Sequence, residues 1–300
     1  MWGLHRFRNF AKQARERRAL RQAERAVARF PMNRLRRPHG LAQPLIVSLT
    51  SYPARYPTLA KTLKSLLDQT VVPDRTILWI SHGDMAALPD EVRAFDGNGL
   101  EIKACDDMRS YKKLIPALRL FPDASIVTAD DDVYYRPDWL ARMVAAAKAE
   151  PGTVVAHRCH LASQDAGGAF RSYADWQMAT DEPTDTADGL LFPTGVGGVL
   201  YPPGSLDPRV LDVATFQALC PHGDDIWLFW MTRLAGTPLH CLGTIEAPIA
   251  WDGSQDVALL HRNWLSGGND EQVQAMERHF GRLARADVDR PTPHLLATEG

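Results

Sequence analysis

The 300-residue sequence has few cysteines and no long apolar run. Its four cysteines lie far apart and form no C-x-x-C pair, which excludes a disulfide framework and a zinc ribbon. No apolar stretch approaches the roughly 18 residues that a membrane span needs, and none with a small-residue cleavage site stands at the N-terminus. We therefore expect a cytoplasmic protein that is neither integral to a membrane nor exported by an evident signal.

Charge is nearly balanced overall, at −2, but it is divided along the chain. Residues 1–40 carry a net charge of +10, and the acidic remainder carries −12. An acidic body makes nucleic acid an unexpected partner. The basic arm, whose arginines are interleaved with apolar side chains, is typical of a helix that lies on an anionic membrane surface, here the cytoplasmic face. The alternatives left open for the arm are a solvated or loosely docked helix and contact with RNA.

From Pro44 onward, short apolar runs alternate with helical patterns. The runs with strand character are residues 45–50, 76–80, 100–104 and 125–129. Leucines at helical spacing predict a helix over Leu59–Leu67, and shorter patterns predict helices around 87–95 and 114–120. This order predicts an α/β fold with a parallel, helix-covered sheet, whose ligands bind beyond the carboxyl ends of the strands.

Three aspartates, Asp130, Asp131 and Asp132, follow the fourth of these strands directly. Alternate residues of an extended chain point to the same side, so Asp130 and Asp132 can converge on one ion. Carboxylates without a Cys or His cluster favour Mg²⁺ or Mn²⁺. Helix capping or a solvated turn is the alternative for an isolated D-x-D pattern, but three mutually repelling acids at this position are hard to explain without a cation.

Five segments, in this order, resemble glycosyltransferases of the GT-A fold and family 2 type. They are Ile46–Arg55, Lys112–Leu118, Ile126–Tyr134, Thr194–Leu200 and Asp224–Leu228. The resemblance covers roughly residues 44–270 and implies a Rossmann-like GT-A sheet flanked by helices, with a C-terminal acceptor-binding half. It divides the chain into an arm (1–40), one catalytic domain (44–285, with halves 44–135 and 136–285) and a flexible tail (286–300).

On the donor side, the resemblance implies a nucleotide-diphosphate sugar held through Mn²⁺ or Mg²⁺. Asp130 and Asp132 would contact ribose and metal, with Asp132 the favoured direct ligand, and His261 would complete the coordination, with His222 and His240 as other candidates. The remaining expected nucleotide-sugar contacts are Thr50, Ser51, Arg55, Asp106, Asp107, Lys112, Lys113 and Asp131. The two lysines would neutralise diphosphate charge, ordinary helix solubility being the alternative.

On the acceptor side, Asp224 and Asp225 open an apolar helix, where N-terminal capping is the alternative to a catalytic role. The resemblance makes an acid here the general base, with Asp225 favoured over Asp224. Gly197 and Gly198 would let an acceptor approach the backbone closely, and a plain turn before a strand is the alternative. Trp227 would offer a face for a sugar ring, with core packing as the alternative.

These expectations describe a metal-dependent glycosyltransferase of the hexosyltransferase type. It would move a sugar to a hydroxyl of a glycan or lipid-linked acceptor, with inversion and cell-surface polysaccharide synthesis as the finer hypotheses. Two alternatives stay open. One is a metal-dependent phosphotransferase or phosphatase, and the other is a non-catalytic sugar-binding protein with the same sheet.

Overall fold

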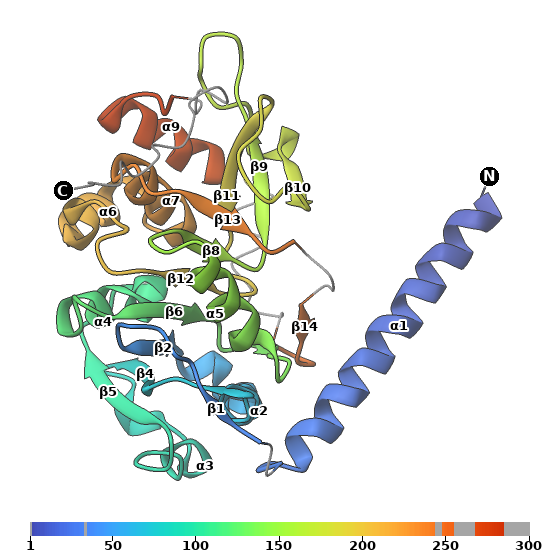
Figure 1. Cartoon of the computed structure of the whole chain (residues 1–300). Coiled ribbons are helices and arrows are strands. Elements are labelled where there is room, and N and C mark those ends of the chain that lie inside the picture. The colour runs from blue at the N-terminus through green and yellow to red at the C-terminus, as the bar shows by residue number, and fades with distance from the viewer. Residues whose placement is uncertain (1, 33–34, 244–247, 255–267, 285–300) are drawn as a thin grey trace, which may run out of the picture.

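The computed structural model describes residues 2–32, 35–243, 248–254 and 268–284. At its centre is a seven-stranded sheet in the order β13-β8-β12-β6-β2-β4-β5 (Figure 1). Only β12 runs antiparallel to its neighbours within this sheet. In chain order the strands are β2 (Leu45–Thr50), β4 (Arg75–Ser81), β5 (Glu101–Cys105), β6 (Ser125–Ala129), β8 (Val154–Ala156), β12 (Val199–Tyr201) and β13 (Leu239–Cys241). The α/β class and the parallel pairing of the four predicted strands are confirmed.

Helices cover both faces of this sheet because its strands are apolar on both sides. Ile46 packs into one core and Val47 into the other, as the alternation of side chains along a strand requires. One face is covered by α2 (Tyr56–Leu67), α3 (Asp90–Arg93) and α5 (Trp139–Ala149). The other face is covered by α4 (Ile115–Leu120), α6 (Val213–Leu219), α7 (Asp224–Leu234) and α9 (Gly268–Phe280).

The helix expected around 87–95 is shorter than predicted. The chain forms a 3₁₀ turn over Met85–Ala87 and then the single turn of α3. Pro89 separates the two, since a proline disfavours the helical conformation of the residue before it. Val92 is the residue that α3 buries in the core.

Three small sheets complete the part of the fold that the structure describes. A three-stranded antiparallel sheet has the order β10-β9-β11. Its strands are β9 (Cys159–Ser163), β10 (Gln177–Thr180) and β11 (Gly189–Pro193). The two-residue strand β7 (Val133–Tyr134) pairs with β14 (Ile249–Ala250), and β1 (Arg37–Pro38) pairs with β3 (Val71–Val72). The β7–β14 pair brings a late segment of the chain against the residues that follow β6.

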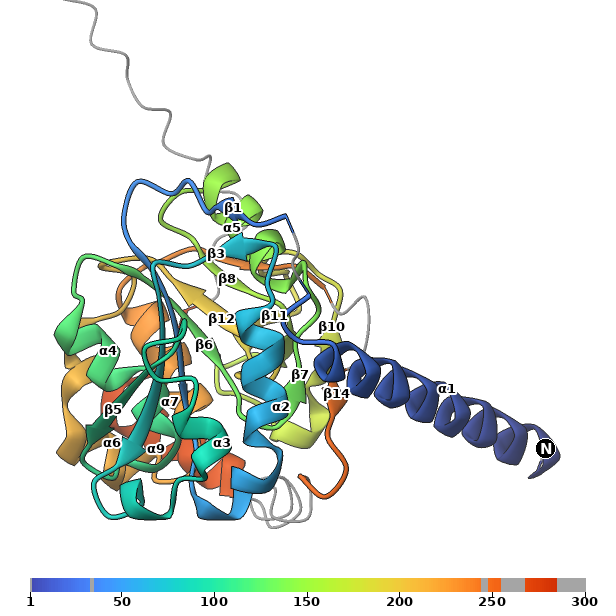
Figure 2. The same ribbon diagram turned by 90° about the horizontal axis from the view of Figure 1, so that it is seen from below.

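The arm forms one long helix, α1 (Trp2–Ala28), which projects away from the sheet (Figure 2). Residues 13–18 are exposed on every side, whereas Ala23 and Val27 near its end are buried against Trp251. Glu24 also lies 3.5 Å from Lys61 of α2. The last turns of α1 are therefore docked on the body. In the described ranges, no helix is both long enough and apolar enough to span a bilayer.

Candidate active site

The carboxyl ends of β2 and β6 lie side by side at the point where the strand order reverses. β2 pairs with β4 on one side and with β6 on the other, and Leu49 of β2 is in register with Ala129 of β6. The loops after these strands therefore start next to each other, and such a switch point is where parallel sheets bind ligands. The loop after β2 holds Ser51 and Arg55, and the loop after β6 holds the three aspartates.

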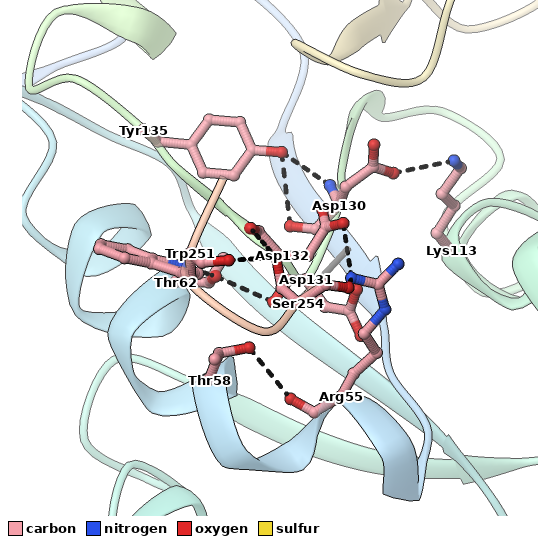
Figure 3. Close-up of polar contacts among 10 residues, drawn as sticks. All are labelled: Arg55, Thr58, Thr62, Lys113, Asp130, Asp131, Asp132, Tyr135, Trp251 and Ser254. Atoms are coloured by element: carbon pink, nitrogen blue, oxygen red, sulfur yellow. Dashed lines mark hydrogen bonds and ion pairs between the residues drawn. The ribbon is translucent and has the colours of Figure 1, made fainter. Parts of the chain in front are cut away.

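Arg55 joins the two loops through a buried ion pair (Figure 3). Its Nη1 lies 2.7 Å from Oδ2 of Asp132, and it also donates to the carbonyl of Ser254. Burial lowers the pKa of Arg55, but the neighbouring carboxylates Asp132 and Asp131 outweigh this and raise it. Arg55 is thus a cation held in place beside the favoured metal ligand.

The backbone of the aspartate triplet is fixed by residues that the sequence did not single out. Trp251 donates its backbone N–H to the carbonyl of Asp132 at 3.1 Å. Its indole Nε1 donates to the Thr62 hydroxyl at 2.8 Å, and that hydroxyl donates to the carbonyl of Asp131 at 2.9 Å. Figure 3 shows these contacts reaching the triplet from α2 and from the segment after β14. They hold the carboxylate-bearing loop in one conformation.

Asp131 is buried beside this ion pair. Burial, with added repulsion from Asp132, raises its pKa to about 7, although the Ser51 side chain opposes the shift. Its Oδ2 has no hydrogen-bond partner within the described part of the chain. A buried carboxylate oxygen without a partner is costly, so Asp131 is poised to accept a proton or a cation.

Lys113 joins the aspartate triplet to the start of α7. Its Nζ lies 3.1 Å from Oδ1 of Asp130 and 3.0 Å from Oδ2 of Asp224, and the residue is only 6% exposed. Burial lowers the pKa of Lys113, but Asp130, Asp224 and Asp225 together raise it well above its usual range. The lysine therefore stays charged and draws three separate segments together.

Asp225 is the second carboxylate at this end of α7. Its Oδ1 accepts a hydrogen bond from the backbone N–H of Gly195 at 3.0 Å. Burial and the neighbouring Asp224 raise its pKa to about 7, while Lys113 opposes the shift. The N-cap of α7 is Gly223, and no side chain caps the helix. Asp224 and Asp225 thus stand in the first turn of α7, where negative charge is favourable, without making a side-chain cap.

Among the glycines of the segment Thr194–Leu200, Gly195 is the one that lies against Lys113 and Asp225. A Cβ there would lie 2.7 Å from Lys113 Nζ and 3.0 Å from Asp225 Oδ1. Gly197 and Gly198 have φ of +99° and +94°, and a Cβ on Gly198 would meet the Trp139 ring at 2.6 Å. Packing and backbone conformation thus account for these two glycines, which were predicted to bind the acceptor. Glycine spacing alone did not distinguish Gly195 from them.

The other expected donor-side residues lie around this centre. Thr50 donates its hydroxyl to the carbonyl of Trp79 at 2.8 Å. Lys112 pairs with Asp107 at 2.7 Å, apart from the Lys113 cluster, and this bond lowers the pKa of Asp107. The side chain of Asp106 is 90% exposed. Asp106 and Asp107 follow β5 at the carboxyl edge of the same sheet.

Two of the sequence expectations need correction or fall outside the structure. Trp227 is 0% exposed and donates to the carbonyl of Val210, so the expectation that it stacks on an acceptor is wrong, and packing is its role. His261 lies outside the described residues. His222 lies against Arg109, with 2.6 Å between Nδ1 and Nη1, and His240 lies 3.2 Å from Glu150.

The donor atoms fit a hard divalent cation. They are all carboxylate oxygens, the carboxylates outnumber Lys113 and Arg55, and Oδ2 of Asp131 is unpartnered in the part of the chain that the structure describes. Among the described residues, no group of three His, Cys, Asp or Glu side chains is arranged to hold a metal. Mg²⁺ and Mn²⁺ commonly take only one or two protein carboxylates and complete their coordination with water and substrate phosphate. One or two carboxylates of the triplet Asp130–Asp132 would fit that pattern.

Comparison with known proteins finds no matching family model and no matching curated protein. Among solved structures, a 4-diphosphocytidyl-2C-methyl-D-erythritol synthase is 14% identical over 73% of this chain and 98% of its own, with a TM-score of 0.41. Two structures of glucosyl-3-phosphoglycerate synthase from Mycobacterium tuberculosis, in complexes that contain Mn²⁺ and UDP, are 19% and 17% identical, with TM-scores of 0.29 and 0.30. The overlap covers 38% of this chain and 43% of those chains. These overlaps are partial and the scores are low.

Proposed function

We propose that this protein is a metal-dependent glycosyltransferase that uses a nucleotide-diphosphate sugar. The observation that carries the proposal is the meeting of Asp130, after β6, and Asp224, at the start of α7, on one buried cation, Lys113. This contact joins the carboxyl edge of the sheet, where the nucleotide would bind, to a helix start that carries a second, half-buried carboxylate, Asp225. Donor-binding groups and a candidate base thus share one site.

On the donor side, the triplet and its supports bind and orient the diphosphate. Asp132, with Asp130, would hold Mn²⁺ or Mg²⁺, which when bound supplies positive charge that stabilises the leaving diphosphate. Arg55 and Lys113 are fixed cations next to these carboxylates and reduce the repulsion between them and the incoming phosphates. Ser51, Thr50, Asp106 and Asp107 would line the nucleoside part of the pocket.

On the acceptor side, Asp225 would take the proton of the attacking hydroxyl. Its pKa of about 7 leaves a substantial fraction ionised at neutral pH and makes it a stronger base than an exposed aspartate. The Gly195 N–H holds one oxygen in place. A base that activates the acceptor on the face opposite the leaving group gives inversion at the anomeric carbon, which is the stereochemistry we propose.

The proposed reaction is tested by incubating the protein with UDP-, GDP-, CDP- and dTDP-sugars, with Mn²⁺ or with a chelator. We expect Mn²⁺-dependent release of one nucleoside diphosphate, measured by ion-exchange chromatography. Release of phosphate from simple phosphoesters would support the phosphotransferase alternative instead. Binding of glycans without turnover of any donor would support the sugar-binding alternative.

Gly195→Ala is expected to lower donor turnover by about tenfold to a hundredfold while the protein stays folded, because small displacements of reacting groups cost that much. The added Cβ would push Lys113 away from its two carboxylates. Gly83→Ala is the matched control, since a Cβ there meets nothing within 4 Å. Turnover and melting temperature are measured for both variants, and unchanged turnover in Gly195→Ala would contradict the site geometry.

We also propose that α1 places the enzyme on an anionic membrane surface, where a lipid-linked acceptor for cell-surface polysaccharide synthesis would be found. Residues 2–18 contain six basic residues and one acid, and residues 13–18 are exposed on every side of the helix. Each Lys or Arg near an anionic surface contributes about 1 kcal/mol. The docked end of α1, at Ala23 and Val27, fixes the direction in which this charge projects.

Deletion of residues 2–18 is expected to weaken binding to phosphatidylglycerol vesicles by at least about tenfold. Ala23 and Val27 remain in this variant, so donor turnover in solution should be unchanged. Vesicle co-sedimentation at low and high salt is the measurement, and binding by the full chain should fall as salt rises. Equal sedimentation of the full chain and the deletion variant would eliminate the membrane role.

A further inference from the structure

Arg158 is a half-buried arginine with no carboxylate partner among the residues that the structure describes. It lies between β8 and β9, and its Nη1 donates to the neutral hydroxyl of Thr194 at 3.2 Å. By contrast, Arg55 and Arg233 each lie within 2.7 Å of a carboxylate oxygen. A partly desolvated guanidinium without a counterion is costly, so Arg158 is suited to bind an anion from outside the chain.

Arg158 is connected to the candidate base through one short segment. The backbone N–H of Thr194 donates to the carbonyl of Arg158 at 3.0 Å, and the next residue, Gly195, donates to Oδ1 of Asp225 at 3.0 Å. Gly197, three residues after Thr194, also packs against Arg158: a Cβ on Gly197 would lie 3.7 Å from the Cβ of Arg158. The guanidinium therefore belongs to the acceptor half of the site.

Tyr173 lies within electrostatic reach of both groups. Its ring packs against Trp176 and Phe192, with centroids 4.6 and 6.1 Å away. Burial raises the pKa of the Tyr173 hydroxyl, Asp225 raises it further, and Arg158 lowers it.

We propose that the acceptor carries a carboxylate or phosphate group, which Arg158 binds while an acceptor hydroxyl meets Asp225. This inference rests on the proposed function. The donor diphosphate has its own cations, Arg55 and Lys113, beside the aspartate triplet. Arg158 is therefore assigned to the acceptor, and its charge selects an anionic acceptor over a neutral one.

The test is calorimetric titration of glucuronate, glycerol 3-phosphate and methyl glucoside into the wild type and two variants. In the wild type, at least one anion should bind about tenfold or more tightly than the neutral sugar, as a charge-assisted hydrogen bond implies. Arg158→Gln should lose that preference, and Arg171→Gln, an exposed arginine with the same charge change, should keep it. Preference for glucuronate identifies a carboxylate, and preference for glycerol 3-phosphate identifies a phosphate.

Equal binding of all three probes to the wild type, or an unchanged preference in Arg158→Gln, overturns the proposal. Titration of UDP, GDP, CDP and dTDP with Mn²⁺ separates it from the proposed function. The affinity for nucleotide should change less than about twofold in Arg158→Gln. If nucleotide affinity instead falls as much as anion affinity does, Arg158 belongs to the donor site and the proposal is overturned. If the wild type binds none of these nucleotides, the proposed function fails instead. Arg158→Lys, which keeps the charge but not the planar fork, serves if Arg158→Gln does not fold, and it should weaken the preference.

Discussion

Replacing Asp132 by alanine is expected to lower Mn²⁺-dependent donor turnover by at least about a hundredfold. Asp132 is the favoured metal ligand, and its loss removes the carboxylate that would hold the cation against the diphosphate. The measurement is release of nucleoside diphosphate across a range of Mn²⁺ concentrations. If turnover and its Mn²⁺ dependence are unchanged in the variant, Asp132 is not part of the metal site.

This variant needs a stability control because Asp132 pairs with Arg55 in a buried position. Removing one partner of a buried ion pair costs about 3–5 kcal/mol, since the other charge is left uncompensated. The double variant Arg55→Gln/Asp132→Ala should recover part of that stability but none of the Mn²⁺ dependence. Recovery of turnover in the double variant would show that the single variant failed through folding alone.

Asp225→Asn is expected to lower turnover by about 10²- to 10⁴-fold, the usual contribution of a general base. The amide keeps the shape of the side chain and can still accept the Gly195 hydrogen bond, but it takes no proton. Asp224→Asn is the matched comparison. We expect a smaller loss of turnover there, because Lys113 keeps its ion pair with Asp130. A larger loss in Asp224→Asn would exchange the roles of the two aspartates.

Asp225→Asn, which is expected to lower turnover, is also expected to raise the stability of the folded protein. The pKa of Asp225 is about 7 in the folded state against an ordinary value of 3.8. The folded protein therefore binds this proton more tightly than the unfolded chain does, and stability is lost as pH rises from about 4 to about 7. Asp225→Asn should remove this loss, so that in metal-free buffer it becomes more stable than the wild type as pH rises through this range. Urea unfolding at pH 5 and pH 8 measures the difference.

The sequence was most informative for residues whose place in the fold follows from the order of the strands. Parallel strands bring their carboxyl ends to one edge, so Arg55 and the residues after β6 were expected together, and the structure places Arg55 2.7 Å from Asp132. Trp251 was not anticipated, because it follows a two-residue strand that has no periodicity to detect and it supports the triplet through its backbone and indole N–H groups. Trp227 was misread because α7 is buried on nearly all sides, and helical spacing does not reveal which side meets a ligand.

The central claim is that the aspartate triplet binds a divalent cation together with a nucleoside diphosphate. Its most direct test is calorimetric titration of UDP, GDP, CDP and dTDP into the full chain, with Mn²⁺ or with EDTA. We predict that at least one nucleotide binds, that Mn²⁺ tightens its binding by at least about tenfold, and that Arg55→Gln/Asp132→Ala abolishes this gain. Failure of every nucleotide to bind at millimolar concentration, with or without Mn²⁺, would contradict it.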